Sequence, residues 1–168
     1  MEIKLINKSE INIKNEPFLL FGRMIPSYSE GEWNYSIQMF PENQVAEMCF
    51  PEDDYNIEAI FVAAYENGIC IGLAVLQDYW FKYMYLYDLK VAKSYRRSGV
   101  GKALIEKAKE IALEKGYRGI YTIGQDNNLA ACKFYINEGF EIGGFDNRSY
   151  RGTSQEGKAD IYFYLELY

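Results

Sequence analysis

The segment that most constrains the fold is Tyr95-Arg96-Arg97-Ser98-Gly99-Val100-Gly101-Lys102, which lies between a strand-like run and a helix-like run. Tyr83–Val91, before it, is rich in aromatic and apolar residues, and the apolar positions of Lys102–Lys115, after it, share one helical face. Two glycines one residue apart let the backbone approach a bulky anion, and the first amides of a helix have no partners within it. The segment therefore predicts a phosphate-binding turn at the start of a helix.

Two well-known phosphate loops do not match this segment. A Walker A loop requires a glycine where this chain has Arg96, and a serine or threonine where it has Ala103. The dinucleotide-binding fingerprint requires a third glycine, which would fall at Leu104. What remains is the pattern R-x-x-G-x-G between a strand and a helix. A plain glycine turn, with Arg96 on the surface, is the alternative interpretation.

Length and composition predict one globular domain, residues 1–168. Hydrophobic residues make up 49% of the 168 residues and charged residues 25%, which is typical of a folded domain. The net charge of -6 argues against a nucleic-acid partner, whose phosphates would be repelled, and favours cationic substrates. A solvated acidic surface is the alternative explanation of the charge.

Cysteine and histidine usage excludes several kinds of site. The chain has no histidine and three widely spaced cysteines, Cys49, Cys70 and Cys132, so histidine-dependent catalysis and a metal site are not expected. Each cysteine is predicted to be a small buried hydrophobe. The amino terminus lacks the apolar run of a signal peptide, and no apolar stretch is long enough to span a bilayer, which predicts a cytoplasmic protein with no membrane partner.

The remaining patterns predict an α/β fold built on a mixed sheet with helices on its faces. Asn67-Gly68 predicts a tight hairpin turn, so three consecutive strands should form an antiparallel meander. The strands are expected at Glu2–Ile6, Ala59–Tyr65, Ile69–Leu76, Tyr83–Val91, Gly119–Ile123, Phe140–Phe145 and Ala159–Leu167, and a second helix at Asn128–Asn137.

Two stretches before the meander show no clear period. Pro17–Tyr35 is aromatic and is broken by Pro26 and Gly31, which predicts an irregular arm that walls a pocket or covers the edge of the core. Pro41 and Pro51 bracket a poorly defined segment, and Glu52-Asp53-Asp54 is typical of a solvated acidic loop.

The second helix carries the family resemblance. Asn128-x-x-Ala131-x-x-Phe134-Tyr135-x-x-x-Gly139-Phe140 resembles a signature of the GNAT acetyltransferases, and it begins about 27 residues after the glycine pair. The resemblance covers roughly Ile57–Tyr168. It implies the GNAT fold, with a central, mostly antiparallel sheet, and an N-acetyltransferase that uses acetyl-CoA as its acyl donor without a metal.

The resemblance also implies a set of coenzyme-binding residues. Backbone groups of Leu89 and Val91 would pair with the pantetheine arm, and Asn128 would bind its amide, although Asn128 as a helix N-cap is an equal alternative. Tyr135 would bind the coenzyme and donate a proton to the departing thiolate, unless it is only a core residue. The pyrophosphate would lie on the loop residues Arg96, Arg97, Ser98, Gly99, Val100, Gly101 and Lys102.

A narrower likeness is to the streptothricin acetyltransferases. It rests on Phe18-x-x-Phe21-Gly22-Arg23-x-x-Pro26-x-Tyr28, Trp33-x-Tyr35, Trp80, Gln125-Asp126-Asn127-Asn128 and Tyr162-Phe163-Tyr164. It implies a cationic primary amine of an antibiotic as the acceptor, hence antibiotic resistance, with Trp33, Tyr35 and Trp80 contacting it. The resemblance allows a homodimer.

The catalytic base is the open part of this interpretation. Where that group is expected to carry Glu-Asp in the central strand, this chain has Tyr87-Asp88, and where a further glutamate is expected it has Ile123 or Gly124. Strict alternation predicts that Tyr87 points into the cleft and that Asp88 points away with a structural role, so the amine proton could leave through water. Tyr87 and Asp88 remain the catalytic candidates beside Tyr135.

Other functions stay open on the sequence alone. A polyamine, an aminoglycoside-like compound or a peptide amine could replace streptothricin as the acceptor. Because acidic side chains are missing at expected positions, an acetyl-CoA-binding sensor without turnover is an alternative from a different functional class.

Overall fold

The computed structural model describes residues 1–46, 55–79 and 81–168. Contacts divide the chain into two compact units: Met1–Glu16 with Glu47–Tyr121 and Glu166–Tyr168, and Pro17–Ala46 with Thr122–Leu165. Whether they make one domain, as the sequence predicts, stays a prediction. The interpretations that concern Cys49, Pro51, the acidic loop at residues 52–54 and Trp80 lie outside the described residues.

The first unit contains the predicted antiparallel meander. Its strands are β1 (Glu2–Ile6), β4 (Ile60–Glu66), β5 (Ile69–Gln77) and β6 (Tyr83–Val91), in the order β1-β4-β5-β6 with every neighbouring pair antiparallel. Asn67 and Gly68 have φ values of 49° and 78°, which confirms the tight turn between β4 and β5. The first three residues of β7 (Gly119–Gln125) pair in parallel with residues 83–85 of β6.

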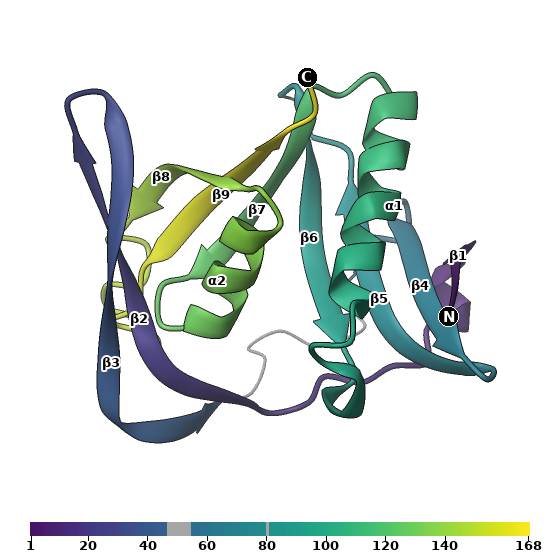
Figure 1. Cartoon of the computed structure of the whole chain (residues 1–168), viewed down its shortest axis with the longest axis horizontal. Coiled ribbons are helices and arrows are strands. Elements are labelled where there is room, and N and C mark those ends of the chain that lie inside the picture. The colour runs from purple at the N-terminus through teal and green to yellow at the C-terminus, as the bar shows by residue number, and fades with distance from the viewer. Residues whose placement is uncertain (47–54, 80) are drawn as a thin grey trace. The chain divides into compact units, whose positions relative to one another are not determined.

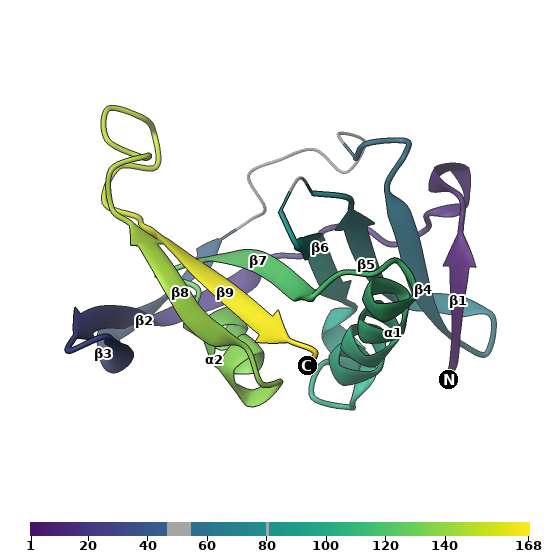
Figure 2. The same cartoon turned by 90° about the horizontal axis from the view of Figure 1, so that it is seen from above.

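Helix α1 (Val100–Glu114) lies along β4, β5 and β6 on one face of this sheet (Figures 1 and 2). The helix can approach closely because Gly72 has no side chain: a Cβ there would lie 2.8 Å from Val100 Cγ1. At its other end Gly116 adopts φ 81°, and Tyr117 N donates to Ala112 O, which closes the helix. The predicted apolar stripe is confirmed as buried: Leu104, Ile105, Ala108, Ile111 and Ala112.

The opposite face of the same sheet carries a second apolar cluster. Leu73 follows Gly72 on β5, so its side chain points away from α1. Around it pack buried residues from β1, β4, β5 and the segments before and after them: Ile6, Ile13, Tyr55, Phe61, Ala63, Cys70 and Val75. The sheet of the first unit is therefore covered by α1 on one face and by this cluster on the other.

The second unit contains a long hairpin where the sequence predicts an irregular arm, and that prediction is wrong. Strands β2 (Phe18–Ser29) and β3 (Glu32–Ala46) pair antiparallel, joined at Glu30 and Gly31, which both have positive φ (Figure 1). Apolar residues on both faces of β2 hide its alternation, although Trp33, Tyr35, Ile37 and Met39 alternate with polar residues along β3. Pro26, opposite Tyr35, is tolerated because each strand of a two-stranded sheet pairs with a neighbouring strand along one edge only. Pro41 also lies within β3.

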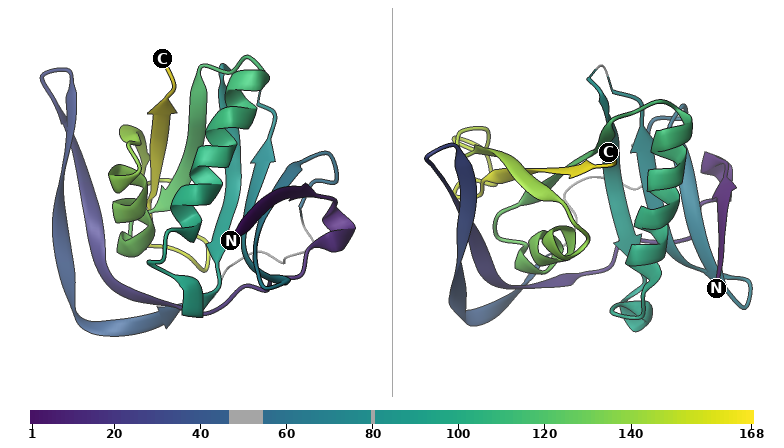
Figure 3. Two further views of the ribbon diagram at one scale, coloured as in Figure 1. Left: turned by 45° about the vertical axis from the view of Figure 1, so that its right-hand side comes forward. Right: turned by 45° about the horizontal axis from the view of Figure 1, so that its top comes forward.

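The rest of the second unit is a helix on a short sheet. Helix α2 (Leu129–Asn137) follows β7 and packs beside β2, as Figure 3 shows, and β8 (Glu141–Asp146) pairs antiparallel with β9 (Asp160–Glu166). The strand order there is β7-β9-β8. The predicted mixed sheet with helices on its faces is thus confirmed. None of the helices in the described residues is long and apolar enough to cross a membrane.

Candidate functional site

The loop between β6 and α1 has the backbone geometry of an anion-binding turn. A short 3₁₀ turn (Lys93–Tyr95) leads to Arg97 with φ 63° and Gly99 with φ 89°. Gly99 is the N-cap residue of α1; it offers no capping side chain, and the first turn of the helix contains no acidic residue. The positive end of α1 is therefore not neutralised by a side chain of its own first turn, so an anion would be attracted there.

Contacts within the loop fix its shape. Arg96 Nε donates to Val91 O at 3.1 Å, and the Ser98 hydroxyl donates to Tyr95 O. Arg96 also lies 3.9 Å from a carboxylate oxygen of Glu16, so its guanidinium holds the loop as well as facing solvent. The side chains of Arg97, Ser98 and Lys102 are exposed, and Val100 is buried. The loop could thus hold a phosphate while Val100 anchors it to the sheet.

Leu89 and Val91 occupy the end of β6 that leads into this loop. They lie opposite Ala74 and Gly72 of β5, whereas β7 pairs with β6 only as far as Tyr85. For residues 86–91, β5 is the one strand paired with β6 in the part of the chain that the structure describes. This arrangement is compatible with an added extended segment on the other edge, and the pairing with pantetheine stays a prediction.

Tyr87 and Asp88 do not take opposite faces of β6, so that prediction is wrong. Asp88 lies opposite Val75 and Leu86 lies opposite Leu76, which leaves Tyr87 as an extra, bulged residue. The Tyr55 hydroxyl donates to Asp88, and the rings of Tyr55 and Tyr87 lie 6.1 Å apart. Both candidate residues therefore contact Tyr55, on the face of the sheet away from α1.

The carboxylate of Asp88 is held by several groups. Its side chain is buried, receives the Tyr55 hydroxyl, and lies 3.9 Å from Lys90 Nζ. Lys90 Nζ also donates to Asn15 Oδ1 at 2.9 Å. These contacts agree with the structural role that the sequence analysis favours for Asp88. Its catalytic role stays a prediction.

In the second unit, Asn128 immediately precedes α2 and Tyr135 lies on the second turn of that helix. Asn128 caps the helix: its Oδ1 accepts from Ala131 N at 3.3 Å, which confirms the capping alternative. Tyr135 is buried, with its ring 5.3 Å from Phe140 and 5.4 Å from Phe163. The aromatic packing fixes the ring, and its role as proton donor stays a prediction.

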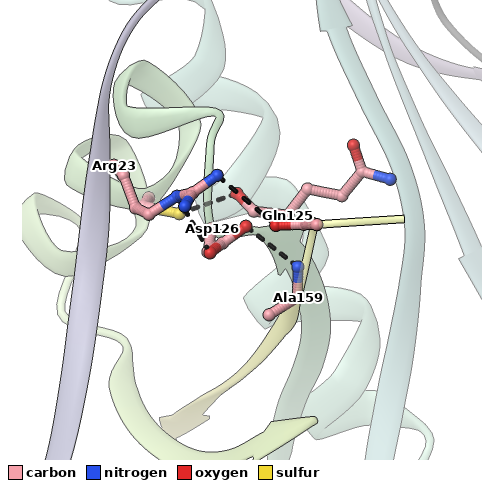
Figure 4. Close-up of polar contacts among 6 residues, drawn as sticks. Arg23, Gln125, Asp126 and Ala159 are labelled. Atoms are coloured by element: carbon pink, nitrogen blue, oxygen red, sulfur yellow. Dashed lines mark hydrogen bonds and ion pairs between the residues drawn. The ribbon is translucent and has the colours of Figure 1, made fainter. Parts of the chain in front are cut away.

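A buried carboxylate that the sequence analysis did not single out connects three elements of the second unit (Figure 4). Asp126 accepts from Ala159 N at 3.0 Å, and its other carboxylate oxygen lies 3.2 Å from Arg23 Nε of β2. The Nε–H group of Arg23 is not aligned for a hydrogen bond with this oxygen. The contact is therefore mainly an attraction between opposite charges. Burial raises the pKa of Asp126, while Arg23 opposes the shift. The Asp126 carbonyl also accepts from Met24 N, which ties the hairpin to the start of α2.

Next to Asp126 along the chain, Gln125 begins a second polar group. Gln125 Nε2 donates to the Tyr150 hydroxyl at 3.0 Å, and Tyr150 in turn donates to Asp160 at 2.7 Å. Burial raises the pKa of Asp160. Only the run Gln125-Asp126-Asn127-Asn128 pointed to this region, because long-range partners such as Tyr150 leave no local pattern.

Of the predicted acceptor-binding residues, Trp33 and Tyr35 lie on the same face of β3. Trp33 is opposite Tyr28, with ring centroids 5.1 Å apart, and Tyr35 is opposite Pro26 and is 42% exposed. Trp80 is outside the described residues. The acceptor role of these side chains stays a prediction.

Titratable side chains elsewhere do not suggest a metal or redox centre. In residues 1–46, 55–79 and 81–168, no group of three or more histidine, cysteine, aspartate or glutamate side chains could hold a metal ion. Cys70 and Cys132 are free and buried, and burial raises the pKa of Cys132 to about 12. Neither thiol is therefore suited to act as a nucleophile.

Comparisons with known proteins agree with this geometry. Streptothricin acetyltransferase A of Bacillus subtilis (strain 168) is 34% identical, over 99% of each chain. The structure of a Bacillus anthracis str. Ames protein assigned as a streptothricin acetyltransferase, in complex with acetyl coenzyme A, is 32% identical with a TM-score of 0.85, over 99% of this chain and 98% of that one. Nourseothricin acetyltransferase, at 22% identity over 98% of this chain and 97% of that one, has a TM-score of 0.81 and supports the fold alone.

A model of the Acetyltransferase (GNAT) family matches residues 26–140. The matched part begins within the last third of β2, ends just before β8, and includes the loop before α1 and the Asn128 signature. The match covers more than half of the chain, and the B. subtilis relative extends the likeness over nearly all of it. The family prediction from the two sequence motifs is confirmed: this chain belongs to the GNAT acetyltransferase family.

Proposed function

We propose that this chain transfers the acetyl group of acetyl-CoA to a primary amine of a small cationic acceptor, and that a streptothricin-like antibiotic is the foremost candidate. The observation that carries the proposal is the likeness to streptothricin acetyltransferase A over 99% of both chains. This likeness includes the β2–β3 hairpin, whose first eight residues precede the family match at residues 26–140. The net charge of -6 is compatible with a cationic acceptor.

The chain's own contribution to coenzyme binding is the β6–α1 loop. Backbone N–H groups of residues 97–102 and the positive end of α1 would hold the pyrophosphate, which such a helix end favours by about 0.3–2 kcal/mol. The positive φ of Arg97 and Gly99 and the absence of a capping side chain on Gly99 support this assignment. When bound, acetyl-CoA supplies the activated acetyl thioester.

Two residues, the N-cap Asn128 and Tyr135 of α2, would act on the reacting end of the coenzyme. Asn128 uses only its amide oxygen to cap the helix, so its amide nitrogen is the group that would bind the pantetheine arm. Tyr135 would hold a proton at its phenolic oxygen for the departing sulfur, with its ring fixed by Phe140 and Phe163. Both assignments follow from the match to the family signature, which the buried, aromatic position of Tyr135 supports.

The amine must lose a proton as it attacks, and β6 supplies the candidates. Asp88 is anchored by Tyr55 and Lys90, so we assign it a fixed negative charge that supports the acceptor side of the strand. The proton would then leave through water, with Tyr87 beside its path on the same face. This assignment needs no acidic side chain at position 123 or 124. Position 124 also has little room for a side chain, because a Cβ on Gly124 would lie 3.0 Å from Phe163 Cε2.

The test is an amine-panel screen that follows thiol release from acetyl-CoA, with mass spectrometry of the products. The panel contains streptothricin, a polyamine, an aminoglycoside and a peptide with a free amino terminus. We expect streptothricin to have the largest kcat/KM in the panel, because the relative that matches over the full length is named as a streptothricin acetyltransferase. A larger kcat/KM for the polyamine or the peptide would correct the acceptor class.

Calorimetry with acetyl-CoA separates the enzyme from a sensor. Acidic residues are absent at two positions where the streptothricin acetyltransferases are expected to carry them, Tyr87 and either Ile123 or Gly124, which favours the sensor as the second candidate. Tight binding of acetyl-CoA without thiol release for any amine would support the sensor, whereas no binding at all would refute both functions.

A further inference from the structure

Five tyrosine side chains of the first unit form one continuous row. Tyr79 stacks on Tyr121 with ring centroids 5.5 Å apart, and Tyr121 lies 5.1 Å from Tyr85. Tyr85 lies 5.8 Å from Tyr87, which lies 6.1 Å from Tyr55. We call these five residues the tyrosine row. Each neighbouring pair is within the range at which aromatic rings attract one another.

The tyrosine row lies on the face of the sheet away from α1. Tyr87 packs against the cluster that contains Leu73 and Val75, and those side chains point away from the helix. Tyr85 and Tyr121 are direct cross-strand partners of β6 and β7, so their rings share one face. The row is therefore separated by the sheet from α1, whose first turn carries the proposed phosphate loop.

We propose that the tyrosine row is the subsite that binds the non-reacting cationic arm of the acceptor, as an ammonium or guanidinium group. This inference rests on the proposed function, and it names the residues that would select a cationic acceptor. Tyr55 and Tyr121 are buried and form the support, and Tyr79, Tyr85 and Tyr87 are half-buried and present ring surface. The faces of such rings carry negative potential, which attracts cations and repels anions.

The structure already contains one cation on this row. Lys90 Nζ lies 5.3 Å from the centre of the Tyr55 ring, within the range of a cation–π contact, and 3.9 Å from the Asp88 carboxylate. A ligand cation beside Tyr85 and Tyr87 would repeat this contact on the neighbouring rings.

Formal charges at the two ends of the row are largely balanced. Asp88 faces Lys90 at one end, and Asp78, next to Tyr79, lies 3.4 Å from Lys115 at the other. A bound cation would therefore gain little from an unpaired carboxylate at either end. The ring faces are the part of this surface that would distinguish a cation from a neutral group of the same shape.

The first arm of the test is equilibrium binding, which does not require turnover. Choline and its neutral isostere 3,3-dimethylbutan-1-ol are titrated into the full-length protein while tyrosine ring resonances are followed by NMR. We expect choline to bind about tenfold more tightly than the isostere. Tyr85→Leu should abolish that preference and Tyr85→Phe should keep it. Tyr65→Leu, which removes a half-buried ring of the same sheet outside the row, should leave it unchanged.

The second arm is kinetic. Tyr85→Leu should raise KM for streptothricin about tenfold, equivalent to about 1.4 kcal/mol, while KM for acetyl-CoA stays unchanged. Should Tyr85→Leu not fold, as judged by its thermal melt, Tyr79→Leu at the end of the row replaces it in both arms.

The outcomes separate the subsite from the proposed function. Equal affinity for choline and its isostere, or an equal loss of preference in Tyr65→Leu, would overturn the cation subsite. If choline binds as expected but no amine in the panel is acetylated, the proposed function fails and the cation site stands.

Discussion

Gly72 connects the sheet to the proposed phosphate loop, and Gly72→Ala tests that connection. A Cβ at this position would lie 2.8 Å from Val100 Cγ1 and 3.0 Å from Leu104 Cδ1. Val100 is the first residue of α1 and is only 3% exposed, and its branched side chain has little freedom to turn aside. The added methyl group should therefore displace the first turn of the helix.

The size of the effect follows from these distances. Carbon atoms in contact prefer a separation of about 3.5–4.0 Å, so Val100 or its helix must move by about 0.7–1.2 Å. Overpacking of this kind lowers the free energy of unfolding by about 1–3 kcal/mol. The same shift moves the loop amides away from hydrogen-bonding distance of a pyrophosphate. Loss of the helix-end contribution of about 0.3–2 kcal/mol corresponds to an increase of about 2- to 30-fold in KM for acetyl-CoA.

Steady-state kinetics and urea unfolding measure both effects. Gly144→Ala is the matched control, because its Cβ would meet Tyr162 at 2.8 Å in the second unit; it should lower stability without changing KM for acetyl-CoA. Val100→Ala removes the methyl groups that collide, so the double variant with Gly72→Ala should lose about 0.5–3 kcal/mol less than the sum of the single variants. An unchanged KM in Gly72→Ala, or strictly additive losses, would refute the argument.

Two further predictions concern the second unit. Tyr135→Phe should lower kcat with little change in the affinity for acetyl-CoA measured by calorimetry, and an unchanged kcat would reject its role as proton donor. Asp126→Asn tests the buried carboxylate by its pH dependence: since burial raises the pKa of Asp126 in the folded state, the folded protein binds this proton more readily than the unfolded chain. Its contribution to the free energy of unfolding therefore rises as pH falls through the folded pKa and is complete near the unfolded value of about 3.9. Urea titrations between pH 7 and pH 4 should show that the wild type gains stability on acidification relative to Asp126→Asn, and parallel curves for the two proteins would contradict this.

The parts of the fold that follow from local patterns could be predicted from the sequence. Asn67-Gly68 predicted the turn between β4 and β5 because those residue types tolerate positive φ. The apolar stripe of α1 predicted which face of that helix is buried. The Glu30-Gly31 turn was missed because glutamate seldom adopts positive φ. Apolar residues on both faces of β2 also obscured the first strand, whereas the alternation of Trp33, Tyr35, Ile37 and Met39 with polar residues was a signal for β3 that the sequence analysis missed.

The same difference between local motifs and long-range contacts applies to the residues of the candidate site. The glycine loop and Asn128 could be assigned because each lies at a helix start, where a short motif specifies the backbone geometry. The contact of Arg23 with Asp126 joins residues about a hundred positions apart, and no local pattern encodes such a pairing. The tyrosine row also joins β6, β7 and the segments around Tyr55 and Tyr79, so its continuity depends on the strand register.

The single extra residue at Tyr87 changes what β6 can do. Without the bulge, alternation would place Tyr87 and Asp88 on opposite faces, and only one of them could meet the acceptor. With it, both contact Tyr55, while Leu89 keeps its place opposite Ala74 on the side of α1. One strand can thereby present tyrosine rings and a fixed carboxylate on one face and lead into the phosphate loop at its end. This separation of roles is the physical reason to look for acceptor specificity in the tyrosine row and coenzyme affinity in the loop.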